Sequence, residues 1–170
     1  MELEEFRLGE TAGMARLQGV DELKFHLCHM AGQSRKRLLI YSHRLNPDLY
    51  NRSGFIEAVR QLVIRHPSTR VQILVADTAE LVRGGHRLLS LAQDLTSSIA
   101  IRHRNEEYEG DLRSFLLADD EGYLMRPIWH DLNNVRADYS ARPVVRNLVG
   151  EFQRAWECSD LDPALRRLHL

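Results

Sequence analysis

The sequence predicts a mixed α/β fold with a largely parallel sheet flanked by helices. Arg37 to Tyr41 and Val71 to Ala76 are near-continuous apolar runs, which is typical of strands that are covered on both faces. Between them, the segment from Phe55 to His66 has apolar residues at helical rather than alternating spacing. A strand, a helix and a second strand in this order indicate a βαβ unit, in which the two strands are parallel.

Length and charge limit the classes of protein to consider. The chain has 170 residues, enough for one domain with a substantial core, and we assign 1–19 to an N-terminal arm and 20–170 to the domain. The formal charge of −1 gives no global attraction to nucleic acid or an anionic membrane. No run approaches the roughly 18 apolar residues of a membrane span, and the start of the chain is acidic rather than basic. We therefore expect a cytoplasmic protein.

Helical periodicity identifies the flanking helices. Apolar residues recur every three or four positions from Val20 to Met30, with Asp21 as the expected N-cap. In the βαβ helix, Ser53 is the expected cap and Pro67 the stop. Later in the chain we expect two helical segments separated by a glycine pair, a long helix and a short C-terminal one, at Thr78 to Arg83, Leu88 to Leu95, Ala141 to Glu157, and from Asp162.

Two further strand signals precede the long helix. Ile99 to Ile101 is a third apolar strand. Phe115 to Ala118 and Tyr123 to Met125 form a hairpin around Asp119 to Gly122, in which the glycine is expected to take a left-handed conformation. Arg126 to Ser140 then reads as a long connection, and connections of that length are usually functional.

The cysteine and histidine pattern predicts no metal and no cofactor. Cys28 and Cys158 lie in predicted helices far apart in the chain and are expected to be free thiols. His26 and His29 share a helix face, but no second ligand pair stands at a zinc spacing.

The order of elements from Val20 to Glu157 resembles one half of the phospholipase D-like fold. Single-half members of that superfamily are homodimers, and each half supplies a histidine, a lysine and an aspartate in the pattern H-x-K-x4-D. In the corresponding stretch of this chain only Asp119 matches, because Leu112 replaces the histidine and Ser114 the lysine. The resemblance therefore implies the fold and the dimer without the family's chemistry, which requires a histidine nucleophile.

A second resemblance is to uncharacterised bacterial domains, some of which lie beside N-acetyltransferase domains. It is carried by the blocks Tyr41 to Tyr50, Gly85 to Leu89 and Leu165 to Leu168. It implies an acetyltransferase or another protein as a partner. Arg16 to Asp21 begins like an acetyl-CoA loop, but Asp21 would direct a carboxylate at the pyrophosphate.

Polar residues gather where the predicted strands end, and they form the candidate ligand-binding set: His43, Arg44, Asp77, His86, Arg102, Arg104 and Arg126. One interpretation is an anion pocket at the carboxyl edge of the sheet, with Arg44 and Arg126 as bidentate donors. The other is that these side chains pair internally. Aromatic residues do not interleave with the set, which argues against single-stranded nucleic acid.

Three hypotheses for the function follow. The first is a non-catalytic phospholipase D-like binding or regulatory module that retains an anion-binding edge. Its homodimer face is expected near the hairpin and the long connection, with Phe115, Tyr123, Trp129 and Tyr139 as aromatic anchors. The second is a phosphoester-acting enzyme that uses His43 and His86. The third is an acetyltransferase-associated protein.

Overall fold

A seven-stranded sheet forms the centre of the molecule in the computed structural model, which describes residues 5–162 and 165. Its strand order is β1-β7-β6-β5-β2-β3-β4. The strands are β1 (Ala15–Leu17), β2 (Arg37–Ser42), β3 (Arg70–Val75), β4 (Ile99–His103), β5 (Ser114–Ala118), β6 (Gly122–Arg126) and β7 (Val135–Asp138). The predicted mixed α/β fold with flanking helices is confirmed.

The sheet is less parallel than the sequence suggested. Only β2–β3 and β3–β4 pair in parallel, and the other four pairings are antiparallel. The physical reason is connection length: parallel neighbours need a crossover of a dozen residues or more, whereas β5 and β6 are joined by a tight turn. The prediction of a largely parallel sheet extended the βαβ pattern too far along the chain.

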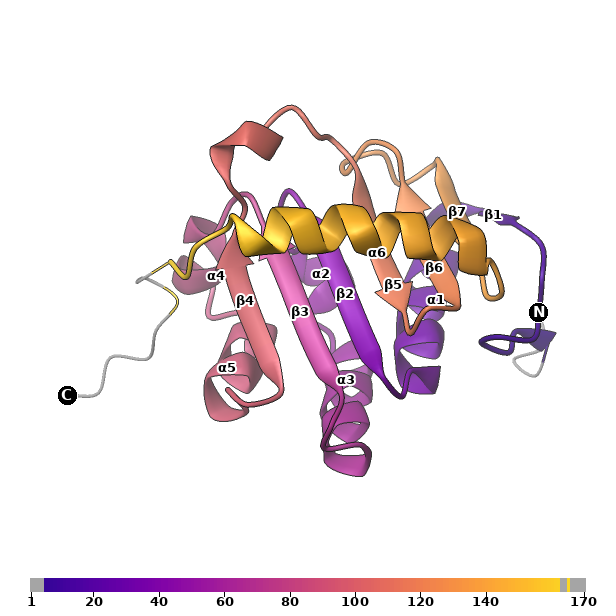
Figure 1. Cartoon of the computed structure of the whole chain (residues 1–170), viewed down its shortest axis with the longest axis horizontal. Coiled ribbons are helices and arrows are strands. Elements are labelled where there is room, and N and C mark those ends of the chain that lie inside the picture. The colour runs from indigo at the N-terminus through magenta and orange to yellow at the C-terminus, as the bar shows by residue number, and fades with distance from the viewer. Residues whose placement is uncertain (1–4, 163–164, 166–170) are drawn as a thin grey trace.

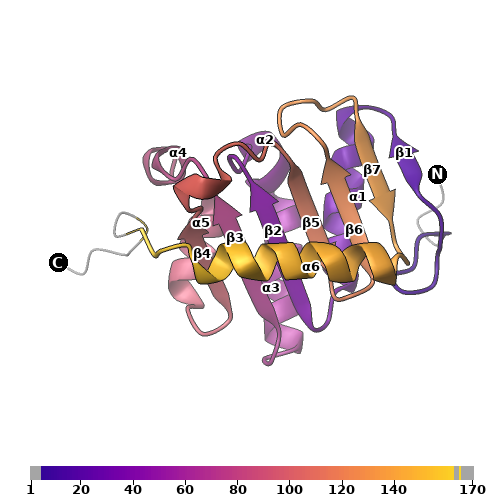
Figure 2. The same cartoon turned by 45° about the horizontal axis from the view of Figure 1, so that its top comes forward.

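Helices cover both faces of the sheet. One helix, α6 (Arg142–Glu157), lies across one face, shown in yellow in Figure 1, and the others lie on the opposite face (Figure 2). The long helices of that opposite face are α1 (Gly19–Gln33), α3 (Ser53–Arg65) and α5 (Arg87–Asp94), and the short α2 (Pro47–Tyr50) and α4 (Ala79–Arg83) follow β2 and β3.

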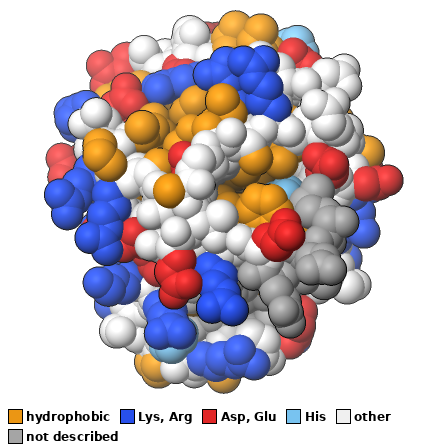
Figure 3. All heavy atoms as spheres, turned by 90° about the vertical axis from the view of Figure 1, so that its right-hand side faces the viewer, with side chains coloured by type: hydrophobic (Ala, Val, Ile, Leu, Met, Phe, Trp, Pro, Cys, Tyr) orange, Lys and Arg blue, Asp and Glu red, His pale blue; other side chains and the backbone are white. Residues whose placement is uncertain are grey.

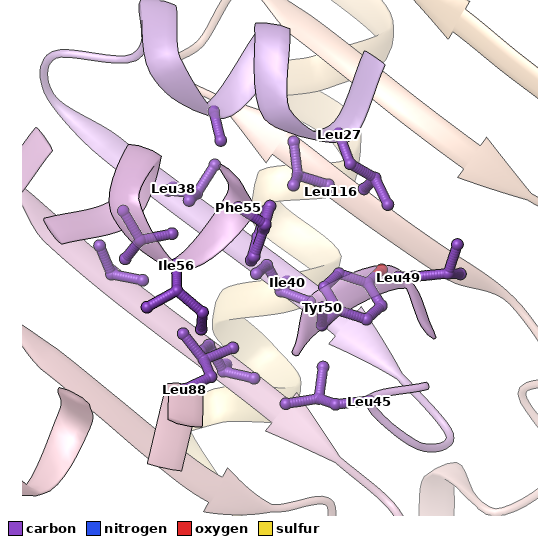
Figure 4. Close-up of a cluster of buried hydrophobic side chains, with 14 of the residues drawn as sticks. Leu27, Leu38, Ile40, Leu45, Leu49, Tyr50, Phe55, Ile56, Leu88 and Leu116 are labelled. Carbon is purple, nitrogen blue, oxygen red and sulfur yellow. The ribbon is translucent and has the colours of Figure 1, made fainter. Parts of the chain in front are cut away.

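Each face of the sheet has its own apolar core. The larger one lies under α1, α3 and α5, and Figure 4 shows the part of it built from Leu27, Leu38, Ile40, Phe55, Ile56 and Leu88. On the α6 face, Tyr41 and Phe115 stack with ring centroids 4.8 Å apart beside Phe152 and Trp156. Strands buried on both faces explain the continuous apolar runs of β2 and β3.

The helix starts differ from the predicted caps by a residue or more. The N-cap of α1 is Gln18, whose backbone N–H donates to the Glu22 carboxylate at 2.6 Å, and Asp21 lies in the first turn. The helix α3 begins at Ser53 itself, after Arg52. Acidic or hydroxyl residues near a helix start make the exact cap ambiguous in sequence.

In the turn between β5 and β6, the residue with the left-handed conformation is not the predicted one. Asp119, rather than Gly122, has a positive φ, of 54°. Its carboxylate accepts backbone N–H groups of Arg35, Lys36 and Arg37 at 3.0, 2.7 and 3.2 Å. Space at Gly122 is tight, because a Cβ there would lie 3.1 Å from the Asp138 backbone carbonyl oxygen as well as 2.7 Å from the end of the flexible Leu8 side chain.

One strand was not recognised in the sequence, and another was left open, because the N-terminal arm was interpreted as either irregular or a short strand. The connection from Arg126 to Ser140 contains β7, and the N-terminal arm contributes β1 at the edge of the sheet. The predicted C-terminal helix lies largely outside the described residues. None of the helices in the described residues is long and apolar enough to cross a membrane.

Candidate functional site

The ends of β2, β5 and β6 meet in a group of polar side chains that bond to one another. Ser114 Oγ donates to Ser42 Oγ at 3.2 Å, and Arg126 Nη2 donates to Ser114 Oγ at 3.0 Å. Arg126 Nη1 also donates to the Trp129 carbonyl at 2.5 Å, and this arginine is only 3% exposed. We call Ser42, Ser114, Arg126 and Trp129 the closed polar edge.

His43 lies against this edge through its ring. The imidazole stacks on the Trp129 indole with centroids 4.5 Å apart and planes 12° apart. The His43 carbonyl accepts the Asp77 backbone N–H at 2.7 Å. Both the ring and the backbone of His43 therefore have structural contacts.

Arg44 and His86 also have internal roles. Arg44 forms an ion pair with Glu80 at 3.5 Å, in which both side chains are about one-third exposed. His86 caps α5, because its Nδ1 accepts the Leu88 N–H at 3.1 Å. Burial lowers the pKa of His86 to about 4, so its imidazole is neutral at pH 7. His86, Asp77 and Glu80 line a cavity of about 90 Å³ whose lining does not include His43.

Arg102 and Arg104 extend towards the α6 side. Arg102 donates to the Trp156 carbonyl at 2.9 Å and lies over its indole at 4.3 Å. Arg104 is 2% exposed, lies 4.5 Å over the Tyr41 ring and donates to the carbonyls of Tyr108 and Asp111. Both guanidinium groups thus pack on aromatic rings, which favours them by cation–π attraction.

The structure therefore divides the seven predicted residues among different surroundings. They do lie at or near strand ends: His43 and Arg126 both contact Trp129, the Asp77 backbone bonds to that of His43, and Asp77 and His86 line one small cavity. Sequence reasoning missed Ser42 and Ser114, although their position as the last residue of one strand and the first of another was a usable signal. Among the described residues no group of three or more metal-binding side chains is assembled.

A second polar network, also missed, lies beside Leu112. Asp111 accepts the Tyr41 hydroxyl at 2.9 Å and Arg113 Nη2 at 2.8 Å, and Arg113 reaches Glu151 of α6 at 3.3 Å. Burial raises the pKa of the Asp111 carboxyl, but these hydrogen bonds outweigh it and hold the pKa below its usual value. The network keeps Asp111 ionised and fixes the loop in front of β5.

The positions of the H-x-K-x4-D pattern can now be compared with their surroundings. Leu112 is 49% exposed, and Ser114 is part of the closed polar edge. Asp119 lies at the opposite end of β5 and holds the turn. The one matching residue therefore has a role in the fold.

A much larger hollow lies away from this edge. It is an open groove of about 1350 Å³ between the N-terminal arm, α1 and α3. Its lining includes cations such as Lys24 and Arg52 and carboxylates such as Asp21 and Glu57, and none of the seven predicted residues. The large volume of this groove is therefore no evidence that it belongs to the same site as the closed polar edge.

Comparison of the sequence with family profiles gives one match. The profile described as a domain of unknown function (DUF7931) matches residues 19–168. The chain belongs to this family. A search of curated protein sequences found no match.

Solved structures show the fold of this DUF7931 domain in other proteins. TrmBL2, an archaeal chromatin protein with a novel mode of DNA binding, has a TM-score of 0.64 at 12% identity over 90% of this chain and 55% of that chain. The chain thus spans about half of TrmBL2. Nuc from Salmonella typhimurium, a phospholipase D family member, has a TM-score of 0.63 at 9% identity over 87% of this chain and 97% of that one.

A third similar structure is the phosphatidylserine synthase of Haemophilus influenzae Rd KW20. It has a TM-score of 0.58 at 11% identity, over 88% of this chain and 36% of that chain. At these identities the likeness is one of fold. It supports the phospholipase D-like architecture that the sequence predicted.

Proposed function

We propose that this chain is a non-catalytic phospholipase D-like module that acts by binding another molecule. The observation that carries the proposal is the pair of residues at the catalytic positions. Leu112 cannot accept a phosphoryl group, and the Ser114 hydroxyl is bonded to Arg126 and Ser42. The similarity to a DNA-binding chromatin protein, beside two enzymes, supports a binding role for such a fold.

Hydrolysis of a generic phosphodiester tests this proposal. We expect purified protein to leave bis-(p-nitrophenyl) phosphate uncleaved above the buffer rate. A turnover that is abolished by His43→Ala or His86→Ala would support the alternative enzyme instead. That alternative is disfavoured because His86 is 3% exposed and caps a helix, and because a different residue, Trp129, covers a face of His43.

The retained anion-binding edge stays a prediction, and the contacts of its arginines argue against it. Arg126 and Arg104 are buried against internal acceptors, and Arg44 is paired with Glu80. Arg126 could bind a phosphate by exchanging Ser114 for the ligand, whereas Arg104 Nε and Nη1 and Arg44 Nε, which have no hydrogen-bond partner among the described residues, are buried and would first have to be exposed. Titration calorimetry with inorganic phosphate decides: no heat of binding indicates a closed edge, and binding that Arg126→Gln removes indicates a retained one.

The homodimer is part of this proposal, with revised contacts. Phe115 and Tyr139 are each 1% exposed within one chain, so the prediction that they anchor a partner is wrong. Leu112 and Ile128 are 49% and 39% exposed, and they adjoin Trp129, whose N–H donates to the Leu112 carbonyl at 2.8 Å. This hydrogen bond joins the backbones of Trp129 and Leu112, so the two exposed apolar side chains lie on adjoining segments, and exposed apolar side chains that lie near one another favour a protein contact.

Light scattering tests the dimer. The chain has a mass of 19.7 kDa, and we expect a mass about twice that at micromolar concentration. Leu112→Glu should reduce the mass to that of one chain, whereas Ile64→Glu, an equally exposed site on α3, should leave it unchanged. A monomer mass across the dilution series would remove the dimer from the proposal.

The acetyltransferase association is the weakest of the three hypotheses. The stretch Arg16 to Asp21 joins β1 to α1, and Asp21 is exposed in the first helical turn. A carboxylate at that place repels a pyrophosphate. Binding of acetyl-CoA, measured by titration calorimetry, would revive an enzyme function, and we expect none.

A further inference from the structure

Two arginines stand side by side at the edge of the sheet, on the opposite face from the closed polar edge. The register of β1 and β7 places Arg16 directly opposite Arg136, and that of β6 and β7 places Met125 opposite Arg136. These three residues therefore cross three neighbouring strands in one line, which we call the arginine row. The strand β1 ends the sheet at this side, as Figure 2 shows.

The arginine row faces away from the larger core. Leu17 and Val135 are buried in the core under α1, and side chains alternate along a strand, so Arg16 and Arg136 point to the other face. The helix of that face, α6, packs on β2, β5 and β6. Arg16 is exposed and Arg136 half-buried, so the row lies beside the helix rather than beneath it.

Neither arginine has an ion-pair partner among the residues that the structure describes. Arg136 Nε has no hydrogen-bond partner among them. Asp138, the acid on the same face of β7, accepts the Ser140 N–H at 3.0 Å. Like charges directly opposite each other destabilise a strand pair. An anionic group placed between the two guanidinium groups would remove that repulsion.

The backbone beside the row is also available. The outer side of β1 carries no strand among the described residues, so an extended peptide can add to the sheet there by main-chain hydrogen bonds. Gly13 and Gly19, with φ of 114° and 85°, bracket β1 and keep it short. Figure 3, which views the molecule from this side, shows basic and apolar side chains next to each other.

We propose that the β1 edge and the arginine row bind an extended acidic segment of a partner protein. A carboxylate of that segment lies opposite Arg16 on the face of the arginine row, where the charge of Arg136 on the next strand also attracts it, and the neighbouring apolar residues of the segment lie on the side of Leu17. Arginine and carboxylate make bidentate, charge-assisted bonds that offset the shortness of the backbone pairing. This surface is separate from the closed polar edge, so hydrolytic activity found at that edge would leave the inference untouched.

Fluorescence anisotropy with a labelled peptide of alternating glutamate and valine tests the inference. We expect saturable binding that Arg136→Gln and Arg16→Gln each weaken about tenfold, and that salt weakens as well. The matched control is Arg65→Gln, an exposed arginine of α3 that also lacks an ion pair in the described residues. A lysine–valine peptide should not bind, and N-methylation of alternate peptide amides should abolish binding.

Three outcomes would overturn the inference. Peptide binding that survives both arginine substitutions would place the contact elsewhere. Binding that tolerates N-methylation in both registers would rule out strand addition. A short DNA duplex that binds more tightly than the peptide through the same arginines would identify nucleic acid as the occupant. Circular dichroism shows whether each variant is folded. Arg16 is exposed, so we expect Arg16→Gln to fold normally.

Discussion

Arg126 and Arg136 lie on the neighbouring strands β6 and β7 but in opposite environments. Arg126 is 3% exposed and donates to Ser114 and to the Trp129 carbonyl. Arg136 is half-buried, lies opposite another arginine and has no ion-pair partner in the described residues. The comparison teaches that an arginine at a sheet edge indicates a ligand site only when the fold has left its donors free.

The two arginines also differ in what they contribute to the fold. At the closed polar edge, buried donors and acceptors satisfy one another, so the strand ends are held by the protein alone. At the arginine row, Arg16 and Arg136 have no ion-pair partner within the described residues. Stability should therefore depend on the first region and binding on the second.

The largest expected effect is at Arg126. Arg126→Met should destabilise the protein by about 3 kcal/mol, because the Trp129 carbonyl and the Ser114 hydroxyl lose a buried donor. Arg136→Met should change the free energy of unfolding by less than about 0.5 kcal/mol. Urea denaturation of the two variants measures both. Equal losses of unfolding free energy in the two variants would contradict the conclusion that Arg126 stabilises the fold and Arg136 does not.

The next largest loss of stability is expected at Asp119, in the turn that follows β5. Asp119→Ala removes an acceptor of three backbone N–H groups and places alanine at a φ of 54°, which we expect to cost about 2 kcal/mol. Asp120→Ala, which removes a partly exposed ion pair with Arg37 at 3.0 Å, is the matched control at about 0.5 kcal/mol. A loss at Asp120 as large as at Asp119 would contradict this role of the turn.

The pH dependence of the free energy of unfolding tests whether His86 is shielded from water in the folded protein. The pKa of His86 is lowered to about 4 in the folded protein from 6.5, so the unfolded chain binds the proton first as the pH falls. Stability is complete above pH 6.5 and is lost progressively down to about pH 4. His26, whose pKa burial also lowers to about 4, has the same sign.

The variant His86→Asn isolates one of these two histidines. Asparagine keeps an N-cap acceptor for α5 but does not titrate. We expect the loss of stability between pH 6.5 and 5, measured by urea denaturation, to shrink by about 1 kcal/mol, since solvent screens part of the charge. An unchanged pH profile would mean that His86 is solvated in the native state.

The smallest expected effect has the opposite sign. Arg16→Glu places a carboxylate directly opposite Arg136, which we expect to stabilise the protein by about 0.5 kcal/mol. The same substitution should abolish binding of the acidic peptide. Thermal unfolding with and without 1 M salt measures the gain, which should vanish as salt screens the pair. A destabilised variant would indicate that the two side chains do not face each other.

The spacing of apolar residues was sufficient to predict the helices and strands in which that spacing is regular over many residues. The βαβ unit, α3, α6 and the β5–β6 hairpin were predicted close to their observed bounds, because apolar spacing reports burial directly. The short strand β7 was missed, and β1 was left open between an irregular arm and a short strand. Three or four residues carry too little periodicity to separate a strand from a connection, and both strands exist because they pair with each other and with β6.

The candidate site was less accessible to sequence reasoning. The position of polar residues after strands correctly placed His43 and Arg126 near one another, since the ends of neighbouring strands meet. Their partners could not be predicted. Trp129 lies in an irregular segment, and the contact of Arg126 with Ser114 depends on the register of the hairpin.

The sequence by itself determined that this is an α/β domain of phospholipase D-like order. Only the tertiary structure decided which charges are free. Asp119 binds the backbone after α1, Arg126 is enclosed, and Arg136 lies beside Arg16 from the other end of the chain. Such pairings join residues remote in sequence, and a side chain's charge is available to a ligand only after the fold has chosen its partners.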